Sequence, residues 1–312
     1  MTEGTKLVSI VSLAFSHQTI DRGEIKLVEF SVEPLHADFG ARLHGLNLSA
    51  DLSDLQLRDI HHAIDTYSFL CFPNQTLSDD NQLALTSRLG VAEVEHVTLG
   101  STGRTSYFGS VGNINEEGIQ QGNQHRDTRY QSGNHLWHSD SSFRHQPSYV
   151  SIMYPYEVPG EGGATEFVSQ RAAYQRLGKV EQSTYQEMTA IHDYVFSRTQ
   201  TAPVNFCHAA SLPPVKHPLI RANPTNQLKN LYIGSHARSI VGLDGIESRR
   251  VIDQLLDNTT RPQDILSHNW QVGEVVIWDN RCVLHRGTGY DADRWRRHMR
   301  QTRVVGEHKG VL

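Results

Sequence analysis

The sequence predicts a β-sandwich decorated with helices, and three observations lead to that expectation. Short apolar or alternating runs, bounded by Gly, Pro or polar clusters, are typical of strands. They occur at about 148–158, 164–168, 229–234, 274–279, 281–285 and 295–305. Strands lie at both ends of this half, with helical patterns between them, as in a sandwich with helices inserted or packed outside. No internal repeat or long linker is visible, so we expect an N-terminal extension over 1–30 and a single domain over 31–307.

Helices are predicted from spacing and from capping residues. Apolar side chains recur at near-helical intervals over 52–67, where Ser53 lies at the start. Ser78 begins a second helix that ends near Gly90. Further helices are expected from Ser169 to Leu177 and at about 181–193 and 245–257. Residues 97–135 are polar and glycine-rich without clear periodicity, and we interpret them as a loop over the functional site.

Composition excludes several classes of function. The net charge of −5 and the pI of about 6.4 argue against nucleic acid as the main partner, because a phosphate-binding surface would carry a basic excess. No apolar run approaches the roughly 18–20 residues that a membrane span needs. Cys71, Cys207 and Cys282 are too few and too widely spaced for a disulfide framework or a zinc site. A reducing, cytoplasmic compartment is the expectation.

The strongest chemical signal is a His-x-Asp pair with a distant histidine. His138 and Asp140 follow an apolar pair, and on a strand their side chains would share one face. Completed by His285, they would form a two-His-one-carboxylate facial triad, which leaves three positions of Fe(II) open for substrate and dioxygen. A rival pair, His125 and Asp127, lies in a polar stretch without packing to hold it rigid. We therefore favour the first pair.

An arginine cluster follows the third candidate ligand. Its members are Arg294, Arg296, Arg297, Arg300 and Arg303. On a strand, Arg296 and Arg300 share one face and Arg297 lies on the other. A charge run is usually a solvated face, and a structural salt bridge is a second alternative. Two arginines on one face near a metal ligand nevertheless suit capture of two carboxylates, because the planar guanidinium binds a carboxylate bidentately.

Three motifs together resemble the taurine/2,4-dichlorophenoxyacetate dioxygenase (TauD/TfdA) family. They are LWHSDSSF at 136–143, GGATEF at 162–167 and WDNRCVLHRG at 278–287. The resemblance runs from about 33 to 306 and is closer to the aryloxyalkanoate branch, on the evidence of residues 141–143 and 233–237. It implies a mainly β fold with flanking helices, a double-stranded β-helix or cupin-like jelly-roll sandwich.

The resemblance also implies roles for individual residues. His138, Asp140 and His285 would be the catalytic iron ligands. Thr165 and Arg296 would hold the distal carboxylate of 2-oxoglutarate.

The substrate pocket follows from the same resemblance. Arg300 would meet an anionic group of the primary substrate. Asn134 matches a pocket position of the family, and His96 with Thr98 stands where the aryloxyacetate enzyme has a lysine that helps to bind the substrate carboxylate. That departure puts a herbicide-like substrate in doubt.

The implied activity is that of a 2-oxoglutarate-dependent dioxygenase, which uses Fe(II), 2-oxoglutarate and dioxygen and releases succinate and carbon dioxide. The expected substrate is a small anion, with a carboxylate favoured, and the outcome could be hydroxylation, oxidative cleavage, desaturation or cyclisation. Neither nucleic acid nor a membrane is an expected partner, and a homo-oligomer stays open. The alternatives are a metal-dependent hydrolase that uses the same triad and a non-catalytic jelly-roll binding module.

Overall fold

Two stacked β-sheets form the body of the protein in the computed structural model, which describes residues 30–95, 106–201 and 212–306. The larger sheet has seven strands in the order β1-β2-β3-β13-β5-β15-β4, and the smaller has the order β12-β6-β14. The larger sheet comprises β1 (Ser31–Pro34), β2 (Ala41–His44), β3 (Phe69–Phe72), β4 (Gly109–Gly112), β5 (Ser148–Glu157), β13 (Val275–Asp279) and β15 (His298–Val305). The smaller comprises β6 (Thr165–Ser169), β12 (Leu266–His268) and β14 (Val283–Gly287).

Side chains alternate between the two faces of each strand, and this alternation separates two cores. On β13, Val276 and Trp278 face the smaller sheet and pack with Phe167 and Val283, whereas Val275 and Ile277 belong to a cluster on the opposite face. The cluster between the two sheets, which contains Val276 and Trp278, also includes Met299 of β15. The odd-numbered side chains of β15 therefore point between the two sheets, where the candidate site lies.

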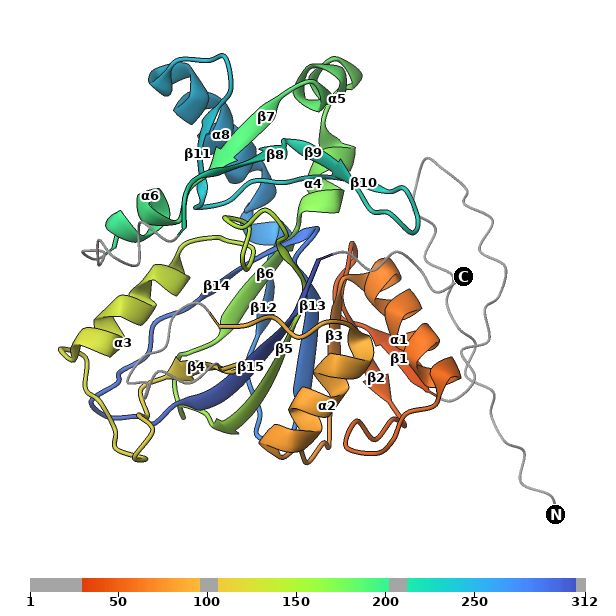
Figure 1. Ribbon diagram of the computed structural model, residues 1–312, viewed down its shortest axis with the longest axis vertical. Helices are drawn as coiled ribbons and strands as arrows, with labels where there is room; N and C mark the ends of the chain where they lie inside the picture. The colour runs from red at the N-terminus through yellow and green to blue at the C-terminus, as the bar shows by residue number, and fades with distance from the viewer. Residues whose placement is uncertain (1–29, 96–105, 202–211, 307–312) are drawn as a thin grey trace.

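Helices α1 (Asp54–Tyr67) and α2 (Asp79–Leu89) cover the outer face of the larger sheet (Figure 1). Each begins with a capping box, in which Ser53 or Ser78 accepts a hydrogen bond from a backbone N–H of the first turn. Ile60 and Ile64 of α1 are completely buried on the sheet. The predicted helices over 52–67 and after Ser78 are thus confirmed.

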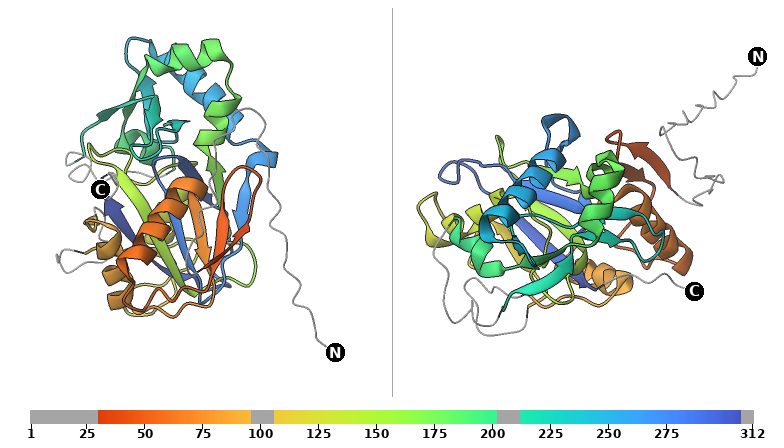
Figure 2. Two further views of the ribbon diagram at one scale, coloured as in Figure 1. Left: turned by 90° about the vertical axis from the view of Figure 1, so that its right-hand side faces the viewer. Right: turned by 90° about the horizontal axis from the view of Figure 1, so that it is seen from above.

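A second group of elements packs against the outer face of the smaller sheet and forms the upper part of the molecule (Figures 1 and 2). Its helices are α4 (Gln170–Arg176), α5 (Lys179–Gln186), α6 (Tyr194–Thr199), α8 (Gly245–Thr259) and the 3-10 turn η2 (Pro262–Asp264). Its strands are β7 (Thr189–His192), β8 (Val215–Pro218), β9 (Ile220–Ala222), β10 (Lys229–Leu231) and β11 (Ala237–Ile240). Val168 and Leu284 of the smaller sheet join the core of this group.

Two sequence-based expectations about secondary structure are corrected. The helix expected over 181–193 ends at Gln186 and gives way to strand β7, in which Ala190 and His192 are buried in alternation. The loop expected over 97–135 contains, in its described part, β4, α3 (Arg126–Gln131) and the 3-10 turn η1 (Ser132–His135). Helix α3 has no buried residue, so no apolar periodicity marked it.

Two further expectations concern the ends of the chain and the membrane. Residues 1–29, most of the expected N-terminal extension, lie outside the described residues, and the single domain over 31–307 stays a prediction. Within the part of the chain that the structure describes, no helix combines the length and the apolar character of a membrane span.

Candidate active site

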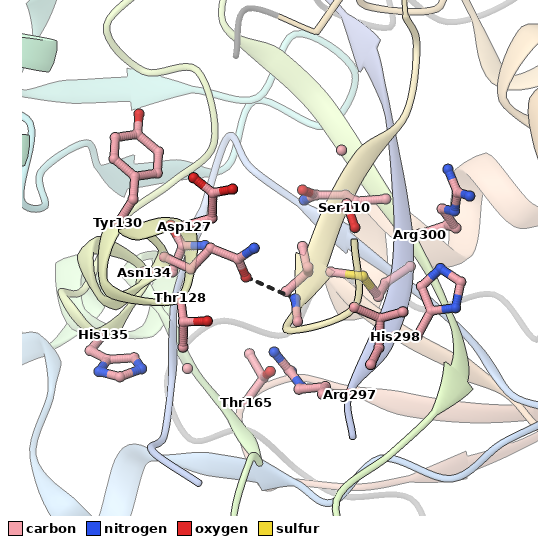
Figure 3. A pocket seen from close by; sticks show the side chains of 18 of the residues that line it. Ser110, Asp127, Thr128, Tyr130, Asn134, His135, Thr165, Arg297, His298 and Arg300 are labelled. Carbon is pink, nitrogen blue, oxygen red and sulfur yellow. Dashed lines mark hydrogen bonds between the residues drawn. The ribbon is translucent and has the colours of Figure 1, made fainter. Parts of the chain in front are cut away.

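A cavity of about 790 Å³ lies between the sheets, at the end where β4, η1 and the start of β15 meet (Figure 3). Both sheets and the segment from Asp127 to His135 contribute to its lining. The three candidate metal ligands line it, together with Thr165 and Asn134. Most of the residues that were expected from sequence to form one site are therefore brought to one cavity.

His138, Asp140 and His285 form a compact cluster whose ligand atoms all lie within 4.8 Å of one another. Nε2 of His138 is 3.9 Å from Oδ1 of Asp140, and Nε2 of His285 is 3.8 Å from Oδ2. Both histidines are buried. The spacing suits one ion that draws the three atoms inward, and the donor set of two imidazoles and one carboxylate is typical of non-haem iron.

The backbone holds the two histidines in register. The N–H of His138 donates to the carbonyl of His285 at 3.0 Å, and the N–H of His285 donates to the carbonyl of His138 at 2.8 Å. Two segments far apart in sequence are thereby joined as a short antiparallel bridge. Ser139 strengthens the joint, because its hydroxyl donates to the carbonyl of Val283 at 2.8 Å.

The protonation states favour metal binding. Nδ1 of His138 lies 2.7 Å from the carbonyl of Leu136, which requires the proton on Nδ1 and leaves the lone pair of Nε2 for a metal. Burial lowers the pKa of His138 and lowers that of His285 to about 3, so both rings are neutral near pH 7. Burial alone would raise the pKa of Asp140, but His285 and Arg303 outweigh it, and the carboxyl stays ionised.

Asp140 is fixed by side chains from both β5 and β15. Its Oδ2 accepts hydrogen bonds from the Ser151 hydroxyl at 2.6 Å and from the Gln301 amide at 2.7 Å. Its backbone N–H donates to Oδ1 of Asn280 at 3.1 Å, and the Asn280 amide in turn donates to Ser151 at 2.8 Å. These hydrogen bonds orient the Asp140 carboxylate toward the two imidazoles. Hydrogen-bond partners of this kind commonly fix the orientation of a metal-binding side chain.

Behind Gln301 lies a buried ion cluster that the sequence analysis did not identify. Arg303 donates to Oε1 of Gln301 at 3.2 Å, to Glu93 at 3.3 Å and to Glu95 at 2.7 Å. Glu93 also accepts the hydroxyl of Ser141. Arg303 is therefore fully paired with acidic side chains. A glutamate some 200 positions upstream gives no sequence signal that it will meet this strand.

Thr165 and Arg297 lie at one end of the cavity, and in Figure 3 their side chains point toward one another. The Thr165 hydroxyl accepts a hydrogen bond from Nε1 of Trp270 at 2.9 Å, so its own proton is available to another acceptor. Arg297 is buried, its Nε has no hydrogen-bond partner, and no carboxylate of the described residues pairs with it. Burial lowers its pKa to about 10, which still leaves it charged. Such a cation requires an anion.

Arg296 does not face the cavity, and this corrects the expectation from sequence. It is partly exposed and forms a bidentate pair with Glu157, with hydrogen bonds of 2.6 and 2.9 Å. The reason is which residues of this segment point toward the helix and which point inward. Gln82 of α2 contacts the even-numbered face at Thr302, so that face is turned to the helix and the face of Arg297 and Gln301 is turned inward.

Arg300 reaches only the outer margin of the cavity. Its guanidinium is 3.8 Å from Asp79 of α2 and lies 5.9 Å from the ring of Phe108. Figure 3 shows it beside His298, pointing away from Thr165. This placement resembles the structural salt bridge that the sequence left open.

The other expected site residues divide into three cases. Asn134 lines the cavity, and its Oδ1 accepts a hydrogen bond from Arg198 at 3.2 Å. His96 and Thr98 lie outside the described residues. His125, from the rival pair, is exposed at the start of α3 and belongs to no ligand cluster in residues 30–95, 106–201 and 212–306.

A second cluster of potential ligands, Cys71, His268 and Glu274, is buried in the core between the sheets. Its polar atoms are paired with one another. His268 Nε2 lies 2.7 Å from Oε1 of Glu274, and the Cys71 thiol donates to Oε2 at 3.4 Å. Burial, with Glu274 nearby, raises the pKa of the thiol to about 12. The cluster reads as a hydrogen-bonded part of the core.

A facial cluster of two histidines and a carboxylate inside a β-sandwich defines a class of proteins, the mononuclear non-haem iron oxygenases. The family model "Taurine catabolism dioxygenase TauD, TfdA family" matches residues 31–303. The chain therefore belongs to this family, as the sequence motifs predicted.

Individual relatives agree with this assignment. The α-ketoglutarate-dependent 2,4-dichlorophenoxyacetate dioxygenase of Cupriavidus pinatubonensis is 34% identical over 279 residues, covering 88% of this chain and 97% of that protein. The (S)-phenoxypropionate/α-ketoglutarate dioxygenase of Sphingobium herbicidovorans is 31% identical, covering 89% and 96%. The crystal structure of AAD-2 with Mn(II) and N-oxalylglycine superposes with a TM-score of 0.81 at 30% identity and covers 91% of this chain and 99% of that one.

These likenesses confirm the jelly-roll fold and the general activity. The protein is a dioxygenase that depends on Fe(II), 2-oxoglutarate and dioxygen. The alternatives of a hydrolase and of a non-catalytic binding module are set aside.

Proposed function

We propose that His138, Asp140 and His285 bind Fe(II) and that Thr165 and Arg297 bind the distal carboxylate of 2-oxoglutarate. The observation that carries the second assignment is the buried Arg297 guanidinium, which faces the cavity of the ligand cluster without an acidic partner among the described residues. It takes the role that the sequence had given to Arg296.

Each side chain has a defined task in this proposal. The Arg297 fork offers parallel N–H donors to a carboxylate, and the Thr165 hydroxyl adds a third donor. Ser151 and Gln301 keep Asp140 ionised and oriented, and the carbonyl of Leu136 fixes the tautomer of His138. When bound, the iron and 2-oxoglutarate supply the oxidising chemistry, with release of succinate and carbon dioxide and oxidation of a substrate C–H bond.

The primary substrate in this proposal is a small organic acid. The relatives named above act on 2,4-dichlorophenoxyacetate and on (S)-phenoxypropionate, which are both carboxylates. The cavity of about 790 Å³ is large enough for a molecule of that size beside the co-substrate. A cytoplasmic location is part of the proposal and is supported by the free, buried thiols of Cys71 and Cys282.

Succinate release tests the proposed function. Purified protein with Fe(II), ascorbate and 2-oxoglutarate should release succinate, and a panel of small carboxylates should contain members that stimulate release above the uncoupled rate. His138→Ala, Asp140→Ala and His285→Ala should each abolish release and lose bound iron, whereas His125→Ala should do neither. A His138→Ala protein with normal iron content and turnover would contradict the assignment.

A further inference from the structure

A second arginine of the cavity, Arg198 of α6, has no acidic partner among the described residues. It lines the cavity, and no carboxylate of the described residues lies within ion-pairing distance of it. The neighbouring segment 202–211 contains no Asp or Glu in its sequence, and neither does 96–105. The charge on Arg198 is therefore not balanced by an acid from those parts of the chain.

The guanidinium of Arg198 is held rigidly in place. Its Nη2 donates to Oδ1 of Asn134 at 3.2 Å, and its Nη1 donates to the carbonyl of Tyr130 at 3.5 Å. It lies 5.0 Å from the centre of the Tyr130 ring and 5.7 Å from that of Tyr194, and the two phenol oxygens contact each other. A Cβ at Gly133 would lie 2.2 Å from Nη1, so a side chain at this position would displace the guanidinium. Cation–π contacts and hydrogen bonds together fix the group against α3 and η1.

Several donors of Arg198 remain available. Arginine has five N–H groups, and the acceptors around Arg198 are the Asn134 amide oxygen, the carbonyl of Tyr130 and the Tyr194 phenol. Its Nε is buried and has no partner. The contact with Arg198 also orients Asn134, because an amide whose oxygen accepts from the guanidinium presents its NH₂ group elsewhere. Asn134 lines the same cavity, on the wall that Figure 3 shows with Tyr130.

Arg198 lines the same cavity as the three proposed iron ligands, His138, Asp140 and His285. An anion bound at Arg198 would therefore lie near the metal cluster, on the side of α6 and η1. Thr165 and Arg297 come from β6 and from the segment before β15, so the two arginines approach the cavity from different elements.

We infer that Arg198, with Asn134, binds the anionic group of the primary substrate. This inference rests on the proposed function, because it assigns the second anion of the same site. It moves substrate recognition from Arg300, whose guanidinium faces Asp79, to α6. It also excludes Arg303, which is already paired with Glu93 and Glu95. The ligand is a small carboxylate whose reactive carbon is directed toward the three iron ligands.

Calorimetric titration measures this role without turnover. The protein is loaded with Mn(II) and N-oxalylglycine, and phenoxyacetate, phenylacetate and benzoate are titrated in turn, each beside its neutral amide. We expect at least one carboxylate to bind wild-type protein about tenfold or more tightly than its amide. Arg198→Gln should remove this preference of about tenfold, because the neutral glutamine amide cannot balance the charge of the carboxylate. Arg198→Lys should retain part of it.

Two controls separate this inference from the proposed function. Arg300→Gln removes a neighbouring guanidinium and should leave the carboxylate preference unchanged. Binding of N-oxalylglycine should be normal in Arg198→Gln, which also verifies that this variant is folded. If wild-type protein fails to bind Mn(II) or N-oxalylglycine, the proposed function fails. If these bind but wild-type protein shows no carboxylate preference, or Arg198→Gln keeps it, the role of Arg198 is overturned.

Discussion

Arg296 and Arg297 are adjacent in sequence but serve different faces of the larger sheet. Arg296 neutralises Glu157 near the surface, whereas Arg297 is buried in the cavity beside Thr165. In an extended segment, adjacent side chains point to opposite faces, so neighbouring residues can lie one in the solvent and one in the interior. A conservative change at one position therefore has consequences that the same change at the other does not share.

Arg297→Ala should raise the apparent 2-oxoglutarate requirement at least about tenfold, because an inward-facing carboxylate would lose its cation. Titration of 2-oxoglutarate at fixed substrate measures the effect. Arg296→Ala is the matched control and should leave saturation unchanged, because an exposed ion pair contributes roughly 0–1 kcal/mol. The reverse pattern would return the role to Arg296.

Gln301 donates a hydrogen bond to Asp140, and in the proposed site it positions this carboxylate without binding the metal itself. We expect Gln301→Ala to weaken Fe(II) binding about 10–100-fold, which is the usual effect of removing a hydrogen-bond partner of a metal ligand. Competition with a chelator measures the affinity, and Gln301→Glu should not restore it, because a carboxylate would repel Asp140 and cannot donate. Unchanged affinity in Gln301→Ala would show that Ser151 alone suffices.

At the scale of single elements, strand β7 carries a histidine that should make stability depend on pH. Burial, with His217 and Arg221 nearby, lowers the pKa of His192 from 6.5 to about 3. Below pH 6.5, His192 is protonated in the unfolded chain but stays neutral in the folded protein. The free energy of unfolding therefore falls as pH decreases from 6.5 toward 3.

His192→Phe should remove this contribution while preserving the stacking on Tyr232. Between pH 7 and pH 4.5 the loss of stability should be smaller in the variant by on the order of 2 kcal/mol. Urea unfolding at the two pH values checks the difference. The exposed His62 serves as the control, because His62→Gln should keep the wild-type pH dependence.

The elements also show why the sequence predicted some features and missed others. The cluster of His138 and Asp140 with His285 and a strand within 295–305 follow from local pattern; the structure brings the three side chains together and places the strand at His298–Val305. Which face of β15 turns inward depends on its packing against α2. Because arginines occur on both faces of this segment, the sequence alone did not indicate which of them point into the cavity. Strand β4, with glycine at each end, and helix α3, with no buried side chain, carry no apolar period to detect.

At the scale of the whole molecule, two clusters of potential ligands lie in the described part of the sandwich, but we expect one metal ion per chain. The thiol of Cys71, with its pKa raised to about 12, stays protonated and is a poor ligand. Elemental analysis of the purified protein should give one equivalent of iron, Cys71→Ser should leave it at one, and Asp140→Ala should reduce it toward zero. Two equivalents in wild-type protein, falling to one in Cys71→Ser, would make the second cluster a true site.

The reciprocal hydrogen bonds between His138 and His285 have a consequence for how the proposed iron site would be filled. Both histidines are positioned by backbone hydrogen bonds that use none of the proposed metal-binding atoms, so we expect the chain to fold without the metal. Small zinc domains differ, because there the binding energy of the metal is the folding energy. Here we expect iron to leave and return as an ordinary ligand, stabilising the fold only through mass action. Chelation should therefore give a folded, inactive apoprotein that recovers on simple addition of Fe(II), without a refolding step.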